Sequence, residues 1–140
     1  MRIKNSTTFT AAELREVIRF VKPNDVSNFD IHFKNCGGAF RGRAYTKGFG
    51  YRGNINPLVI VSIGKAEKFP LRIKANGAYL PVDLYSRIEA LVLVTAHELR
   101  HLWQAQHPKG WRAWGSRGQY SERDADAYAI RTLRAWRRSK

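Results

Sequence analysis

At 140 residues the chain has the length of one domain, and its single cysteine excludes an internal disulfide and a zinc site made of four cysteines. Its 25 lysines and arginines outnumber its 11 aspartates and glutamates, and the resulting formal net charge of +14 favours a polyanionic partner such as nucleic acid. No apolar run has the length of a signal peptide or a membrane span, so we expect a soluble, cytoplasmic protein without a membrane partner.

The N-terminal part of the chain predicts an amphipathic helix. Thr10 and Glu13 have the spacing of a capping box, in which each side chain binds the backbone of the other residue. Apolar residues then recur at helical intervals until Pro23, which cannot continue a helix. We therefore expect a helix over residues 10–21.

Strands are predicted in the middle of the chain. Polar and apolar residues alternate in residues 29–34 and again in residues 39–45, a pattern that is typical of two neighbouring strands in a meander. The apolar and β-branched residues at 57–64 favour a buried strand. The sequence therefore predicts a small sheet after the first helix.

A hairpin is predicted just before the next helix. Asn76 and Gly77 suit a tight turn between strands at residues 71–74 and 78–82. Pro81 is tolerated in an edge strand but not in a central one. We therefore expect the segment GAYLPVD, residues 77–83, to form the edge of the sheet.

The C-terminal half predicts two helices joined by a loop. A helical pattern begins at Asp83 or Ser86 and ends before Pro108. Ser121 suits the N-cap position of a last helix, which ends in a basic segment. Together the elements predict an α+β fold, with residues 1–140 in a single domain that has a basic C-terminal end.

Three of the four histidines lie in the longer of these two helices. His97 and His101 are four residues apart, so their imidazoles project from one helix face and can bind one metal ion. Neutral imidazoles bind zinc and leave it Lewis acidic. Glu98 lies beside them, where a carboxylate can take a proton from a zinc-bound water. This H-E-x-x-H arrangement predicts a zinc site with Glu98 as general base.

Two residues are candidates for a third protein ligand. His107 has the spacing of the last histidine in H-E-x-x-H-x-x-G-x-x-H metzincins, although Gln104 stands where that motif has glycine. The only methionine is Met1, so the methionine turn of metzincins has no counterpart. Glu122 and Asp126 share one face of the last helix, so one could bind zinc while the other holds a ligating histidine by its second nitrogen.

The segments HELRH, residues 97–101, and ERDAD, residues 122–126, resemble the gluzincin pattern H-E-x-x-H … E-x-x-A-D. HtpX-like and CAAX-prenyl-type peptidases share this pattern, and ImmA/IrrE-like domains have a looser form. The small size, the positive charge and HELRH are also similar to SprT-like peptidases, which act on DNA-bound proteins. The resemblance implies that His97, His101 and Glu122 are zinc ligands. It also implies that Glu98 is the general base and that the carboxylate of Asp126 supports a ligand.

The resemblance also implies a zincin-like architecture. A helix and a small, twisted, mostly antiparallel sheet would precede the central H-E-x-x-H helix, and the C-terminal helix would carry the third ligand. The edge strand would line the cleft, where a peptide adds as an extra strand. A further donor should stabilise the oxyanion, and the candidates are His107, Tyr120 and Tyr128. The expected function is that of a zinc-dependent metalloendopeptidase acting on peptides or proteins.

A basic and aromatic stretch lies between Asp30 and Glu67, where the sequence has no acidic residue. Such a mixture can contact phosphates and stack bases. The residues that we expect to contact nucleic acid are Arg41, Arg43, Lys47 and Arg52. The alternative function is therefore a basic nucleic-acid-binding protein whose zinc site is structural or vestigial, and a peptidase recruited to DNA would combine the two.

Overall fold

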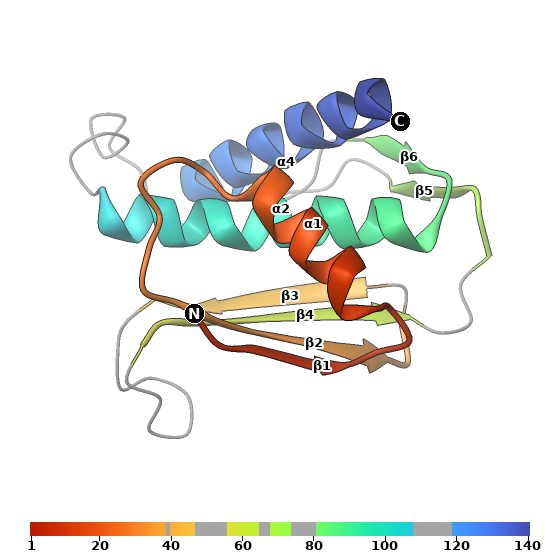
Figure 1. Cartoon of the computed structure of the whole chain (residues 1–140). Coiled ribbons are helices and arrows are strands. Elements are labelled where there is room, and N and C mark those ends of the chain that lie inside the picture. Colours follow the sequence, from red (N-terminus) through yellow and green to blue (C-terminus); the bar gives the residue numbers. More distant parts are fainter. Residues whose placement is uncertain (39, 47–55, 65–67, 74–80, 108–118) are drawn as a thin grey trace.

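In the computed structural model of the chain, the described helices lie on one face of a four-stranded sheet (Figure 1). The structure describes residues 1–38, 40–46, 56–64, 68–73, 81–107 and 119–140, the last range without the side chains of Gln119 and Tyr120. The helices are α1 (Ala11–Val21), α2 (Arg87–Gln106) and α4 (Gln119–Ser139). The strands are β1 (Ile3–Ser6), β2 (Asp30–Cys36), β3 (Phe40–Tyr45), β4 (Leu58–Gly64), β5 (Leu71–Ile73) and β6 (Val82–Leu84). This arrangement confirms the predicted mixed α+β class.

Helix α1 begins as the sequence predicts. The backbone N–H of Glu13 donates to the Thr10 hydroxyl over 3.0 Å, and the Thr10 N–H donates to the Glu13 carboxylate over 2.8 Å. This reciprocal capping box satisfies two N–H groups that a helix start otherwise leaves without a partner. The apolar side of α1 is buried against the core through Leu14, Val17, Ile18 and Val21.

The four-stranded sheet has the order β1-β2-β4-β3. Strands β1 and β2 pair parallel, β2 and β4 pair parallel, and β3 pairs antiparallel with β4. The predicted meander and the mostly antiparallel sheet are therefore wrong, because β4 lies between β2 and β3. Alternation shows which face a strand buries but not which strand it pairs with, whereas the continuous apolar run of β4 suits a central position. The short edge strand β1 was not predicted.

The smaller sheet is the antiparallel pair of β5 and β6, with Leu71 opposite Leu84 and Ile73 opposite Val82. Strand β6 thus begins at Val82, the residue at which the predicted strand 78–82 ends. The predicted turn falls in residues 74–80, outside the described residues. Since β6 belongs to this separate sheet, the prediction of an edge strand of the main sheet is wrong for residues 82–83, and residues 77–80 lie outside the described residues. Strands β1 and β3 form the edges of the main sheet.

Helix α2 lies between the main sheet and α4, and contacts both. Ser86 caps its start by accepting a hydrogen bond from the Glu89 N–H, which is one of the two predicted starts. Burial on both sides encloses apolar residues such as Leu91, Leu99 and Leu102 together with the polar Thr95, His97, Glu98 and Gln104. The H-E-x-x-H segment therefore lies in the interior of the domain.

Helix α4 begins at Gln119, so the prediction that Ser121 is its N-cap is wrong and Ser121 lies in its first turn. Its buried side presents Ala125, Ala129 and Leu133 to the core. These residues recur every four positions, which is the spacing of one helix face. Among the described residues, none of the helices has a segment long and apolar enough to cross a membrane.

The end of α4 is attached to the start of α2 by an arginine–carboxylate pair. Arg137 donates to both carboxylate oxygens of Glu89, over 3.0 and 2.7 Å, and also to the carbonyl of Asp83. The N–H of Tyr85 donates to the same carboxylate over 3.0 Å. The hydrogen bonds from Arg137 hold the pKa of Glu89 below its ordinary value, and burial opposes them only in part.

We expect Glu89→Gln to lower the free energy of unfolding at neutral pH by about 1–3 kcal/mol, because it breaks charge-assisted hydrogen bonds of a half-buried pair. A lowered pKa stabilises the fold above the unfolded pKa of about 4.3, and this contribution is lost as the pH falls through the folded value. Urea unfolding of wild type and variant at several pH values would measure the difference.

Glu16→Gln is the matched control, because Glu16 pairs with Lys140 and both side chains are about half exposed, at 53% and 49%. We expect it to cost less than about 1 kcal/mol. Equal losses in the two variants, or a loss in Glu89→Gln that does not shrink at low pH, would contradict the stabilising role of the Glu89 pair.

Candidate metal centre

His97 and His101 occupy successive turns of α2, with ring centroids 4.9 Å apart. Together with Glu98 they form a group of potential ligands, and one ligand atom from each lies within 4.8 Å of the others. His97 and Glu98 are buried and His101 is half-buried. The structure thus contains a largely buried His-Glu-His group that could hold a metal ion.

Glu122 of α4 contacts both histidines. Its Oε2 lies 3.0 Å from Nε2 of His97, and its Oε1 lies 2.9 Å from Nε2 of His101. These hydrogen bonds, that of His101 first, hold the pKa of Glu122 well below its usual range. Two ligands of a tetrahedral zinc ion lie about 3.3–3.5 Å apart, given bonds of about 2.0–2.2 Å. The two carboxylate–imidazole distances are thus close to the separation of ligands around one such ion.

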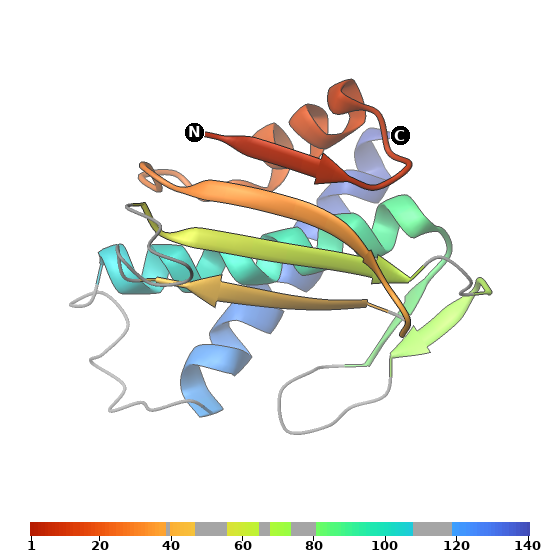
Figure 2. The same ribbon diagram turned by 90° about the horizontal axis from the view of Figure 1, so that it is seen from below.

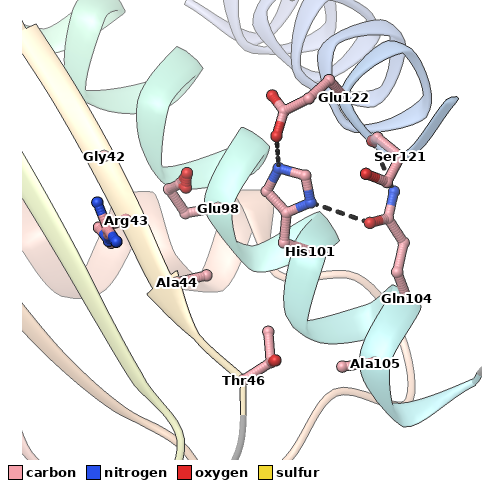
Figure 3. A pocket seen from close by; sticks show the side chains of 10 residues that line it. All are labelled: Gly42, Arg43, Ala44, Thr46, Glu98, His101, Gln104, Ala105, Ser121 and Glu122. Carbon is pink, nitrogen blue, oxygen red and sulfur yellow. Dashed lines mark hydrogen bonds and ion pairs between the residues drawn. The ribbon is translucent and has the colours of Figure 1, made fainter. Parts of the chain in front are cut away.

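Gln104 orients His101 from the other side (Figure 3). Its side-chain oxygen accepts a hydrogen bond from Nδ1 of His101 over 2.9 Å. Its amide nitrogen donates to the carbonyl of Ser121 and to Asp124, each over 2.9 Å, and these two acceptors define which way the amide points. His101 is thereby held with Nε2 toward Glu122.

The bonds to His101 also favour its protonated form. Burial acts to lower the pKa of His101, but the hydrogen bond to Glu122, the charge of Glu98 and the bond to Gln104 outweigh it and raise the pKa. His101 must lose the Nε2 proton before that nitrogen can bind a metal. Metal affinity should therefore fall as the pH falls.

Asp126 lies on the Nδ1 side of His97. Its Oδ1 is 3.9 Å from Nδ1 of His97, and the residue is only 1% exposed. A carboxylate on the Nδ1 side of a histidine favours the tautomer that binds metal through Nε2. Both histidines therefore have a polar side chain on the side opposite Glu122, Gln104 for His101 and Asp126 for His97.

Glu98 is buried against β3. It is 6% exposed, and among the described residues its Oε2 has no hydrogen-bond partner. A Cβ atom added to Gly42 would lie 2.5 Å from Cγ of Glu98 and 2.8 Å from Cγ1 of Val94, so only glycine lets β3 pass this close to α2. Burial raises the pKa of Glu98, although His97 and His101 act in the opposite direction.

A cleft of about 420 Å³ opens beside this group. Figure 3 shows that β3 lines one side of the cleft, whereas α2 and α4 line the other. The lining residues are Gly42, Arg43, Ala44, Thr46, Glu98, His101, Gln104, Ala105, Ser121 and Glu122. The edge strand beside the cleft is therefore β3, and the described residues 81–83 of the predicted segment do not line it.

Two other predicted residues have structural roles instead. Since α2 continues to Gln106, His107 lies about 9 Å further along the helix axis than His101. Its ring stacks on Trp103 at a centroid distance of 5.0 Å, and its Nδ1 donates to the Trp103 carbonyl over 3.0 Å. The Tyr128 hydroxyl donates to the Val21 carbonyl over 2.6 Å. In the structure both side chains are thus engaged in contacts away from the His97–Glu98–His101 group.

The remaining predicted site residues divide between the sheet and the undescribed part of the chain. Arg41 and Arg43 are exposed on β3. Lys47, Arg52 and the side chain of Tyr120 lie outside the described residues. Sequence reasoning missed Gln104 and Gly42. Only Gln104 carried a signal, because it lies three residues after His101 and so on the same helix face.

Comparisons with protein-family models, with curated proteins and with solved structures found no match for this chain. The resemblance to gluzincins therefore depends on the two sequence motifs and on the geometry around them. The geometry by itself establishes a largely buried group that could hold a metal ion.

We expect Glu122→Ala to weaken zinc binding by about 10-fold or more and His107→Ala to change it by no more than about 2-fold. Glu122 contacts both histidines, whereas His107 contacts Trp103. Competition with a chromophoric chelator would measure both affinities. The reverse ranking would move the third ligand to His107 and remove the basis for the gluzincin resemblance.

We expect Gln104→Leu to weaken zinc binding by about 10–100-fold, because His101 loses the group that orients it. Gln106→Leu is the matched control on the same helix, since Gln106 exchanges hydrogen bonds only with the backbone of Ser27 among the described residues. Zinc titration of both folded variants would compare them. Equal zinc affinities would show that Gln104 supports the fold and not the metal centre.

Proposed function

We propose that the chain is a zinc-dependent endopeptidase of the gluzincin type, acting on peptides or proteins. The observation that carries this proposal is the placement of Glu98. This carboxylate is buried beside two histidines that share Glu122, and it lines an open cleft. A buried acid with a raised pKa next to potential metal ligands is typical of a catalytic group.

The ligand set favours a catalytic centre over a structural one. Structural zinc sites normally have four protein ligands, whereas catalytic sites have three and keep one position open. Here the side chains of His97, His101 and Glu122 converge, and the cleft lined by Glu98 lies beside them. When bound, zinc would supply a Lewis acid that polarises the scissile carbonyl and lowers the pKa of water.

Glu98 would act as general base and then as general acid. It would accept a proton from the attacking water and deliver that proton to the leaving amine. Its raised pKa brings it closer to neutral pH, where a group can exchange a proton in both directions. Asp126 and Gln104 would keep the two histidines in place during these steps.

Strand β3 would hold the substrate. It is the last strand in the sheet order, so one of its edges is free of the sheet's own strands. Its residues Gly42 and Ala44 line the cleft, together with Thr46, which follows the strand. An extended peptide can add to such an edge through backbone hydrogen bonds. Gly42 brings this strand close to α2, so a peptide paired with its outer edge would lie beside Glu98.

We expect protein purified without chelators to contain one zinc per chain and to cleave an unfolded protein substrate. Glu98→Gln should keep the metal and lower cleavage by about 100-fold or more, because it removes the proton acceptor. His97→Ala should lose both. Elemental analysis and a gel-based cleavage assay, with and without added DNA, would test these expectations.

Glu16→Gln is again the matched control, since Glu16 is an exposed residue of α1, and it should retain metal and cleavage. If the wild type contains zinc that His97→Ala loses, but cleaves no substrate under any condition, the alternative of a nucleic-acid-binding protein with a structural or vestigial zinc site would be favoured. Full cleavage by Glu98→Gln would remove Glu98 from the mechanism.

A further inference from the structure

Figure 2 views the face of the main sheet that points away from the helices. The strand register places rows of basic residues on this face. In one row, Lys4 is opposite His32, His32 is opposite Ile60, and Ile60 is opposite Arg43. In the next row, Lys34 and Arg41 flank Ser62. Since Ile31, Phe33, Val59 and Val61 are buried against the core, these neighbours alternate to the outer face.

We call this surface the basic sheet face and define it by Lys4, His32, Lys34, Arg41, Arg43 and Tyr45. The four described main-sheet strands contain one carboxylate, Asp30, which lies at the end of the face and accepts a hydrogen bond from the Arg2 N–H over 3.0 Å. Burial, Lys4 and Lys34 all lower the pKa of His32, in keeping with a positive local field. The face is therefore strongly cationic.

The face is also hollowed and carries an aromatic ring. A hollow of about 360 Å³ is lined by Lys34, Arg41, Gly42, Arg43, Tyr45, Ile60 and Ser62. The Arg43 guanidinium lies over the Tyr45 ring, 5.5 Å from its centre. On β4, uncharged Ile60 and Ser62 separate the cations of β3 from those of β1 and β2. Basic residues of β3 on one side, and of β1 and β2 on the other, thus border an uncharged strip on β4, and the Tyr45 ring lies beside this strip.

We propose that the basic sheet face binds single-stranded nucleic acid without sequence preference. Arg41 and Arg43 are two residues apart on β3, about 6.6 Å, a spacing that suits successive phosphates of an extended strand. Bases would turn toward Ile60 and Tyr45, because every base can stack on an aromatic ring. Lys4 and Lys34 would contact phosphates on the far side of the strip.

The shape of the face favours a single strand over a duplex. Proteins usually read a duplex by placing a helix or a two-stranded ribbon in its major groove. The described helices lie on the opposite face of the sheet (Figures 1 and 2). The main sheet is about 14 Å across from β1 to β3, given strands about 4.8 Å apart, so it fits one extended strand.

This inference does not depend on the proposed peptidase activity, but the two surfaces meet at β3. Gly42 and Arg43 line both the cleft beside the candidate metal centre and the hollow on the basic sheet face. A strand bound to this face would therefore lie next to the cleft. Binding can be measured in the absence of any cleavage, so failure of either proposal would be recognised separately.

The test is fluorescence anisotropy of the full chain with labelled oligothymidine of about 20 nucleotides, at several salt concentrations. The test variant changes Lys4, Lys34 and Arg41 to Gln and leaves Arg43 in place, because Arg43 also lines the cleft. We expect its dissociation constant to rise by about 10-fold or more at low salt. The slope of log affinity against log salt should fall by about 2, since each phosphate contact on a single strand contributes about 0.7.

The matched control changes Arg131, Arg134 and Arg138 to Gln, which removes the same charge from exposed positions of α4. Circular dichroism and urea unfolding would establish that both variants fold. The proposal is supported if the control binds oligothymidine within about 2-fold of wild type. Equal weakening of both variants, unchanged binding of the test variant, or tighter binding of a duplex of the same length would overturn it.

Discussion

The structure depends on one constraint, which is that α2 is buried on both sides while it carries polar residues in its centre. His97, Glu98 and Gln104 are each at most 6% exposed. Polar groups of this kind are costly to bury unless hydrogen bonds satisfy them. Helix α4 meets this need for His97 and Gln104, with Glu122 at both histidines and Asp124 at Gln104, whereas Oε2 of Glu98 has no hydrogen-bond partner among the described residues. The packing of α4 on α2 and the construction of the candidate centre are therefore the same contacts.

Local signals predicted the elements that depend on local chemistry. The capping box of Thr10 and Glu13, the Ser86 cap of α2 and the two motifs on α2 and α4 could all be read from spacing, because one helix face recurs every three or four residues. The partners of the strands could not, since alternation in β2 and β3 is the same whether they pair with each other or with β4. That pattern predicted an antiparallel meander of β2 and β3, whereas in the structure both strands pair with β4.

The candidate site shows the same division. Glu122 could be named because its motif places it on one helix face with Asp126, and the structure brings it to both histidines. Gly42 could not be named, because its role arises from the approach of β3 to Glu98 across a distance of more than fifty residues in the chain. Gln104 stood in the sequence as the residue that breaks a metzincin pattern, although its amide is what orients His101.

The distribution of charge explains how one small chain can carry both surfaces. Five of its 11 carboxylates lie on α2 and α4, namely Glu89, Glu98, Glu122, Asp124 and Asp126, so the outer face of the sheet keeps its cations with little compensation. Successive side chains of β3 point to opposite faces of the sheet, so this strand separates the candidate metal centre from the basic sheet face. Two of its inward residues, Gly42 and Ala44, are small enough to admit α2 and to line the cleft, whereas Arg41 and Arg43 alternate to the opposite face. A shift of one residue in the register of β3 would place an arginine against Glu98 and remove it from the basic sheet face. The candidate metal centre and the basic sheet face therefore require the same pairing of β3 with β4.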